Sequence, residues 1–151
     1  GAGASLALCC DIVIACENAS FIQAFSKIGL IPDSGATFFL PRLIGMQKAT
    51  GLMMTGEPIS AMEAEKIGMI YKVFSNESFE QESLKLAKKL AKMATKGLGL
   101  TKRLLNSSYI NNLGEQLNME RDYQTIAGNT VDYQEGVDAF LAKRKPEFKG
   151  K

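Results

Sequence analysis

The most restrictive feature of this chain is an abrupt change of composition about a third of the way along it. Residues 1 to about 45 are rich in glycine, alanine and larger apolar residues and carry few charges. From Met46 onward, apolar residues recur at helical spacing instead. A length of 151 residues is enough to bury a sizeable core. The change predicts an α/β region over residues 1–75 and a helical region over residues 76–151, the latter expected to mediate oligomerisation.

Short elements are predicted in the first part. The segment Ala2–Cys10, small and apolar all round, favours a helix pressed into a core. The runs Ile12–Ala15 and Ala19–Ile22 are typical of short buried strands. A loop containing Pro32 follows, and then a helix of about two turns that ends near Pro41. Two or three short strands cannot easily close a sheet, so this third is expected to need a partner surface outside the chain.

From Met46 onward, helices dominate the prediction. Met46–Thr55 is expected to be a helix closed by Gly56, and Ser60 opens a capping-box helix that stops at Gly68. Asn76 is predicted to cap a long amphipathic helix. The remaining predictions are a strand over Met69–Phe74 and helices over Leu98–Tyr109, Leu113–Ala127 and Tyr133–Arg144.

Composition excludes several classes of function. The chain has no histidine, which excludes an imidazole base, a Ser-His pair or a histidine-bearing metal site within it. With 18 basic and 16 acidic residues, the net charge of +2 gives no case for nucleic-acid binding. No apolar run approaches a membrane span, and no basic leader is visible. Three cysteines within the first sixteen residues (Cys9, Cys10 and Cys16) favour reduced, buried thiols in a cytoplasmic protein without a metal site.

Three segments together carry a family resemblance. They read GAGASLALCCDIVIACENASFIQAFSKIGLIPDSGATFFLPRLIG, LMMTGEPISAMEAEKIGMIYKVF and EGVDAFLAKRKPEF. In this order they resemble the enoyl-CoA hydratase/isomerase (crotonase) family, most closely its ring-epoxide isomerase branch, which acts on epoxyphenylacetyl-CoA in phenylacetate breakdown. The resemblance implies an α/β fold, namely part of a ββα crotonase spiral followed by a helical C-terminal region. It also implies an acyl-CoA thioester substrate, no cofactor apart from the coenzyme A of that substrate, and a homotrimer or hexamer.

The resemblance also implies an oxyanion hole made by two backbone N–H groups. One corresponds to the opening turn Gly1-Ala2-Gly3, with Ala2 the best match and Gly3 the next. From the residues alone, small side chains before a helix favour tight helix–strand packing, and it is the resemblance that favours the oxyanion hole. The family's first half, which carries the other donor, has no counterpart here. Because the sequence begins at Gly1 inside a motif, we expect it to be the C-terminal part of a crotonase.

Asp33 is the candidate catalytic residue. The two glutamates of the family's hydratases match Ser5 and Phe25, neither of which can act as a carboxylate. Asp33 lies where isomerase-type members place a single acid. From the residues alone it is also a good N-cap for the following helix, and both roles can coexist. Phe25 is expected to line an aromatic acyl pocket, and the resemblance points to Lys143 as a coenzyme A contact.

The expected function is acyl-CoA isomerisation, either a double-bond shift or a ring-epoxide isomerisation, in phenylacetate or fatty acid catabolism. Two alternatives stay open: an enoyl-CoA hydratase, and a truncated, catalytically incomplete chain that only oligomerises. The stretch from Lys85 to Asn112 contains seven basic residues and no acid. It could attract coenzyme A phosphates or be a solvated helix face.

Overall fold

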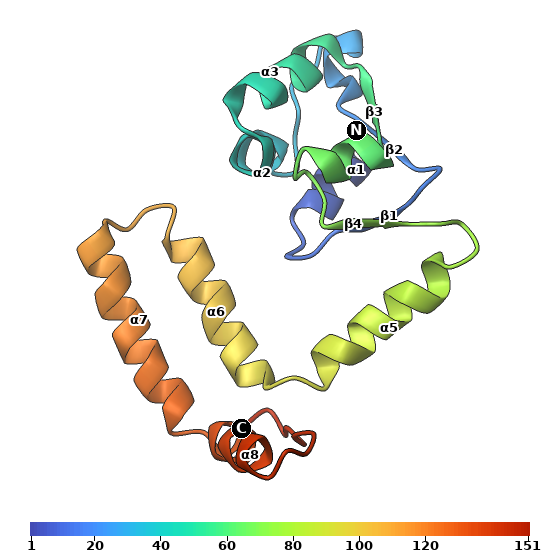
Figure 1. The fold of residues 1–151 in the computed structure, drawn as a ribbon. Helices are drawn as coiled ribbons and strands as arrows, with labels where there is room; N and C mark the ends of the chain where they lie inside the picture. Colours follow the sequence, from blue (N-terminus) through green and yellow to red (C-terminus); the bar gives the residue numbers. More distant parts are fainter. The chain divides into compact units, whose positions relative to one another are not determined.

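A computed structural model describes all 151 residues and divides into two compact units, Gly1–Ser83 and Leu84–Lys151 (Figure 1). The division falls inside helix α5 (Phe79–Ala91). Acidic residues outnumber basic ones in the first unit, and basic residues outnumber acidic ones in the second. The small net charge of the chain therefore comes from two units of opposite sign.

The first unit combines short strands with short helices. Strand β1 (Ile14–Cys16) pairs in parallel with β4 (Lys72–Phe74), with Ile14 opposite Lys72. Strand β2 (Ser20–Ile22) pairs antiparallel with β3 (Pro58–Ser60), with Ser20 opposite Ser60. The strands thus form two separate ladders of two strands each. The helices are α1 (Ala2–Leu8), the 3₁₀ helix η1 (Ala24–Ile28), α2 (Ala36–Ile44), α3 (Met46–Thr55) and α4 (Ala61–Lys66).

Small residues let these helices pack closely. Leu40 of α2 is fully buried at the centre of the core. Around it, alanines such as Ala49 and Ala64 are also buried, so that neighbouring backbones can approach closely. Helix α1, by contrast, is predicted from the sequence to be pressed into a core, but it buries only Ser5 and Leu8 and leaves Leu6 61% exposed, so that prediction is wrong.

Two predicted helix ends are confirmed and two predicted boundary features are wrong. Gly56 and Gly68 follow α3 and α4 in the left-handed conformation, with φ of 62° and 77°. Helix α2, however, continues through Pro41 to Ile44. Burial of Leu40 and the packing of Ile44 against the core offset the hydrogen bond that proline cannot donate.

Asn76 does not cap α5. Its side-chain oxygen accepts a hydrogen bond from the Cys16 thiol at 2.7 Å, across the ends of β4 and β1. The hydroxyl of Ser75 instead accepts from the Ser78 amide at 3.3 Å, just before the helix. The local pattern predicts Asn76 as the cap, but its side chain instead bonds a residue that lies 60 positions away in the sequence.

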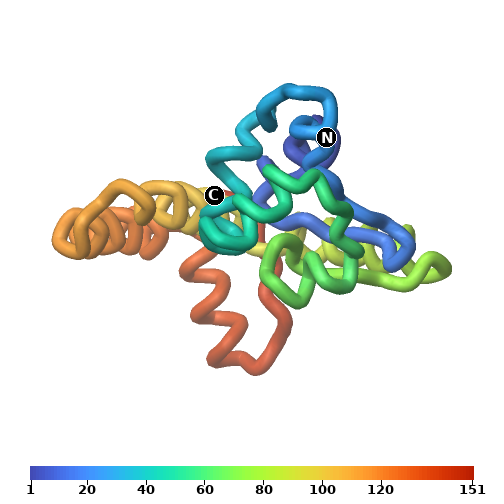
Figure 2. The backbone as a smooth tube through the Cα atoms, turned by 90° about the horizontal axis from the view of Figure 1, so that it is seen from above, coloured from blue at the N-terminus to red at the C-terminus, as the bar shows by residue number.

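The second unit is helical, with α6 (Thr95–Ser107), α7 (Leu113–Gly128) and α8 (Val131–Leu141) following α5. Helices α6 and α7 lie side by side in both views (Figures 1 and 2). Asn112 opens α7 with a reciprocal capping box: its side chain accepts from the Glu115 amide at 3.0 Å, and Glu115 accepts from the Asn112 amide at 2.9 Å. None of the helices in the chain has the length and apolar character needed to cross a membrane.

The tail after α8 folds back onto the start of that helix. Asp132, which is buried, accepts hydrogen bonds from the amides of Lys149 at 2.6 Å and Gly150 at 2.8 Å. Its own amide donates to the Lys151 carbonyl at 3.1 Å. Glu135 holds the Arg144 guanidinium with two contacts of 2.6 and 2.8 Å. The basic tail is thus fixed by two carboxylates of α8.

Candidate functional site

The opening turn of α1 leaves backbone donors unpaired by the helix. The Gly1 carbonyl accepts from the amides of Ala4 at 3.0 Å and Ser5 at 3.2 Å, and the Gly1 nitrogen donates to the Ile22 carbonyl. Ala2 and Gly3 are the first residues of the helix, so no earlier helical carbonyl can accept from their amides. Both residues are exposed. The turn therefore offers N–H groups at the positive end of the helix dipole.

Asp33 lies in the turn that precedes α2, and it is exposed. Its carboxylate accepts a hydrogen bond from the Ser34 hydroxyl at 3.1 Å, and its carbonyl accepts from the Ala36 amide at 3.0 Å. The N-cap of α2 is Gly35, and no side chain caps this helix. The N-cap alternative for Asp33 is therefore wrong, and its carboxylate is not used to hold the helix.

The backbone of this turn is strained. Ser34 has φ of 51° and Gly35 has φ of 79°, so two consecutive residues are left-handed. Only Ser34 and Lys143 among the non-glycine residues of the chain have positive φ. Such conformations cost of order 1–3 kcal/mol and persist only where their surroundings hold them. The two non-glycine residues with this strain are thus Ser34, next to the candidate acid Asp33, and Lys143, the candidate coenzyme A contact.

The end of α1 contacts the Asp33 turn. The Cys9 thiol lies 3.4 Å from the Ser34 carbonyl and 3.3 Å from the Ser5 carbonyl of its own helix. All three thiols are free, but Cys9 and Cys10 are exposed, so the prediction that they are buried is wrong. At 1.5 Å per residue, Ala2 and Cys9 are about 10 Å apart along the helix axis. One short helix therefore spans from the candidate oxyanion donors to the turn that carries the candidate acid.

The two positions that the resemblance matches to the hydratase glutamates, Ser5 and Phe25, carry no carboxylate. Ser5 is completely buried, and its hydroxyl lies 3.4 Å from the Gly1 carbonyl. Phe25 is half-buried in η1, where its carbonyl accepts from the Leu30 amide at 3.0 Å. Asp33 is connected to the end of α1 through two contacts, from Cys9 to Ser34 and from Ser34 to Asp33.

Gln23 is a site feature that the sequence analysis missed. It lies between β2 and η1, is only 3% exposed, and neither its Oε1 nor its Nε2 has a hydrogen-bond partner. Its neighbour Ile22 accepts from Gly1, so Gln23 adjoins the opening turn along the chain. A glutamine directly after a short apolar strand is the signal that could have drawn attention to it.

Lys143 follows α8 in a left-handed conformation with φ of 52°. Its amide donates to Phe140 at 3.2 Å and the Arg144 amide donates to Ala139 at 3.0 Å. This is the Schellman pattern that closes helices, with lysine at the position where glycine is usual. Lys143 is exposed.

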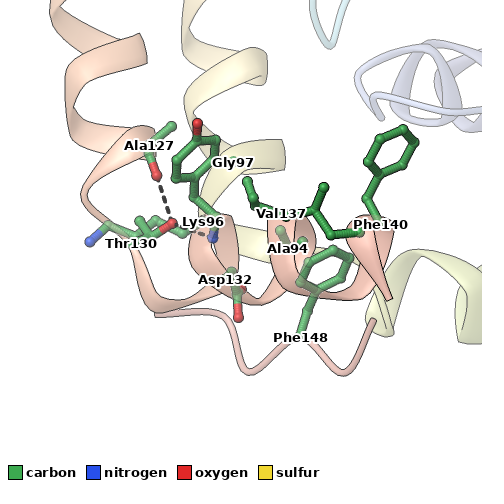
Figure 3. A pocket seen from close by; sticks show the side chains of 12 residues that line it. Ala94, Lys96, Gly97, Ala127, Thr130, Asp132, Val137, Phe140 and Phe148 are labelled. Atoms are coloured by element: carbon green, nitrogen blue, oxygen red, sulfur yellow. Dashed lines mark hydrogen bonds between the residues drawn. The ribbon is translucent and has the colours of Figure 1, made fainter. Parts of the chain in front are cut away.

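Helix α8 also forms one side of an apolar pocket of about 420 Å³ within the second unit (Figure 3). Val137, Phe140 and Phe148 line it together with Ala94, and Lys96 also contributes. Asp132 also lines the pocket, but both of its carboxylate oxygens accept hydrogen bonds from amides of the C-terminal tail, those of Lys149 and Gly150. The pocket therefore suits an apolar group rather than acid–base chemistry, and Lys143 is not among its lining residues. No three histidine, cysteine or acidic side chains gather as a metal site anywhere in the chain.

Comparisons with known proteins place the chain in a family. All of residues 1–151 match the family described as Enoyl-CoA hydratase/isomerase. The chain is 52% identical to the 1,2-epoxyphenylacetyl-CoA isomerase of Escherichia coli (strain K12), covering 100% of this chain and 58% of that protein. It is 38% identical to the 2,3-dehydroadipyl-CoA hydratase of the same organism, covering 100% and 59% respectively.

A crystal structure agrees with this placement. The enoyl-CoA hydratase from Polaromonas sp. JS666 superposes with a TM-score of 0.94 at 39% identity, over 99% of this chain and 58% of that one. The chain belongs to the enoyl-CoA hydratase/isomerase family, and its fold is part of the crotonase fold. It spans about three fifths of the length of the relatives it matches.

Proposed function

We propose that the protein carrying this chain is an acyl-CoA isomerase in which Asp33 moves a proton and the Ala2 amide, aided by Gly3, stabilises a thioester enolate. One observation carries the proposal: Asp33 is held in a strained turn against the end of α1, while the first amides of that helix are unpaired within it. The reaction is a double-bond shift or a ring-epoxide isomerisation. The 52% identical relative is named an isomerase of this second kind.

The proposed reaction needs a hydrogen-bond donor for the thioester oxygen and a group that carries a proton. Removing a proton near a thioester places negative charge on its oxygen, and a preorganised N–H donor stabilises that charge by about 2.7–4 kcal/mol. One carboxylate that takes a proton from one carbon and returns it to another contributes about 10²–10⁴-fold.

The remaining parts of the proposal concern residues outside the opening turn and the Asp33 turn. Phe25 contacts the acyl group, and Lys143 contacts the coenzyme A of the substrate, with no further cofactor. Since the chain spans 58% of its 52% identical relative, the second oxyanion donor comes from the remainder of the protein, which acts as a homotrimer or hexamer in the cytoplasm.

Hydration is the second candidate, because a 38% identical relative is named a hydratase. Adding water needs one group to activate the water and another to protonate carbon. The burial of Ser5 and the apolar side chain of Phe25 supply neither.

The experiment compares Asp33→Asn with the wild type in the complete protein. We expect kcat to fall about 10²–10⁴-fold with KM little changed, measured on a 3-enoyl-CoA and on an aromatic epoxide thioester. Glu57→Gln, a change at an exposed acid outside the site, is the control. Full activity of Asp33→Asn would overturn the proposal, and incorporation of labelled water into crotonyl-CoA would favour hydration. Oligomerisation of the 151-residue chain by itself, with no binding in an acyl-CoA titration and no turnover, would favour the catalytically incomplete alternative.

A further inference from the structure

The turn that carries Asp33 needs a restraint from outside itself. Ser34 is left-handed although it is not glycine, and such a residue relaxes unless its surroundings hold it. Within the turn, the Ala36 amide bonds the Asp33 carbonyl and the Ser34 hydroxyl bonds the Asp33 carboxylate. These bonds fix the turn internally, but they do not fix it relative to α1.

Cys9 makes a contact between this turn and α1, in addition to the packing of α1 against α2. Its thiol lies 3.4 Å from the Ser34 carbonyl. A Cβ added at Gly35 would lie 3.7 Å from the same sulfur and 2.9 Å from the Phe39 ring, so the turn is enclosed between the thiol and that ring. Each of the two neighbouring thiols lies near a carbonyl of its own helix, Cys9 at 3.3 Å from Ser5 and Cys10 at 4.0 Å from Leu6. Cys9 differs from Cys10 in its additional contact with the Ser34 carbonyl of the turn.

The Cys9 thiol is connected to the Asp33 carboxylate through Ser34. Cys9 fixes the Ser34 carbonyl, and the Ser34 hydroxyl orients the Asp33 carboxylate at 3.1 Å. The helix that ends near Cys9 begins with the amides of Ala2 and Gly3. We propose that Cys9 is a positioning residue, which sets the distance between the oxyanion donors and the Asp33 carboxylate by fixing the Ser34 carbonyl to the end of α1. This inference rests on the proposed function.

A positioning role predicts a specific kinetic signature. Thiols are weak donors, so the loss of one such contact should lower kcat about three- to tenfold, with KM unchanged. Cys9→Ala in the complete protein should show this loss. Cys9→Ser keeps a donor to the Ser34 carbonyl and should lie between Cys9→Ala and wild type. Cys10→Ala, which removes the neighbouring exposed thiol, should leave kcat unchanged.

A chemical test avoids dependence on folding of the variants. In a Cys10→Ala, Cys16→Ala background, methyl methanethiosulfonate transfers its methylthio group to Cys9 and releases methanesulfinate, which removes the S–H donor from the folded protein. We expect kcat to fall at least as far as in Cys9→Ala and to recover when dithiothreitol reduces the mixed disulfide. Mass spectrometry confirms a single adduct.

The outcomes separate this inference from the proposed function. If Asp33→Asn loses activity while Cys9→Ala and the methylthio adduct keep the kcat of Cys10→Ala, the positioning role is wrong and the proposed function stands. If Cys9→Ala lowers the unfolding temperature and raises KM as much as it lowers kcat, Cys9 is only structural. If Asp33→Asn is fully active, the proposed function fails and the positioning role fails with it.

Discussion

Replacing Lys143 with glycine should stabilise the protein while weakening its binding of acyl-CoA. Lys143 has φ of 52° at the C-terminal end of α8, in a Schellman motif whose hydrogen bonds are both formed. A left-handed conformation costs a non-glycine residue about 1–2 kcal/mol. Glycine avoids this cost but adds about 0.5–1 kcal/mol of backbone entropy to the unfolded chain. The net gain lies between about 0 and 1.5 kcal/mol.

The matched control is Lys143→Ala, which removes the same charge and keeps the Cβ. The glycine variant should exceed the alanine variant by about 1 kcal/mol in free energy of unfolding. For a protein of this size, that is a rise of about 2–4 °C in unfolding temperature. Urea unfolding followed by circular dichroism provides the free energies, and calorimetry provides the temperatures. Both variants should lose the same affinity for acyl-CoA, since both lack the ammonium group.

Equal stability of the glycine and alanine variants would refute the reasoning, because it would show that the left-handed conformation is not maintained in solution. Unchanged acyl-CoA affinity in both variants would leave the strain argument intact and remove Lys143 from the binding site.

Two further predictions concern stability. Gln23→Met removes a buried amide without partners, so the free energy of unfolding should rise by about 1–3 kcal/mol in urea titrations of this chain; no change would mean that the amide finds a partner in solution. The hydrogen bonds from Arg144 and from the Glu147 amide lower the pKa of Glu135 from its ordinary value to about 2. Because the folded-state pKa is depressed, its contribution is complete above pH 4.5 and is lost as the pH falls toward 2. Glu135→Gln should therefore flatten the dependence of unfolding temperature on pH over that range, whereas an unchanged slope would contradict the role of this pair.

The sequence predicted correctly those element ends that are determined by residues close by in the chain. Gly56 ends α3 because glycine, which has no Cβ, adopts the left-handed conformation at that position without a steric penalty. Ser60 opens α4 because its hydroxyl accepts a hydrogen bond from the Glu63 amide at 3.2 Å. Strand β3 was missed because three residues, Pro58–Ser60, are too few to show an alternating pattern. Asn76 was misassigned because its partner, Cys16, is distant in sequence.

The candidate site shows the same limit. Asp33 and the opening turn were selected as candidates by the family resemblance, because from the residues alone the glycines favour tight packing and the acid favours an N-cap. The left-handed conformations of Ser34 and Lys143 could not be predicted from the sequence, because the usual signal for such a conformation is glycine or asparagine. The isolation of the Gln23 amide also could not be predicted, because burial of a glutamine depends on segments that meet only in the fold.

The opposite charges of the two units have a consequence for handling the protein. From a net charge of only +2, one would expect the chain to bind weakly to any charged resin. Because the two units carry opposite charges, however, the chain should bind both to an anionic resin and to a cationic resin. The first unit of one copy would attract the second unit of another copy at low ionic strength, and this attraction would be screened beyond about 8 Å in physiological salt. Aggregation during purification should therefore depend on salt more strongly than the isoelectric point suggests.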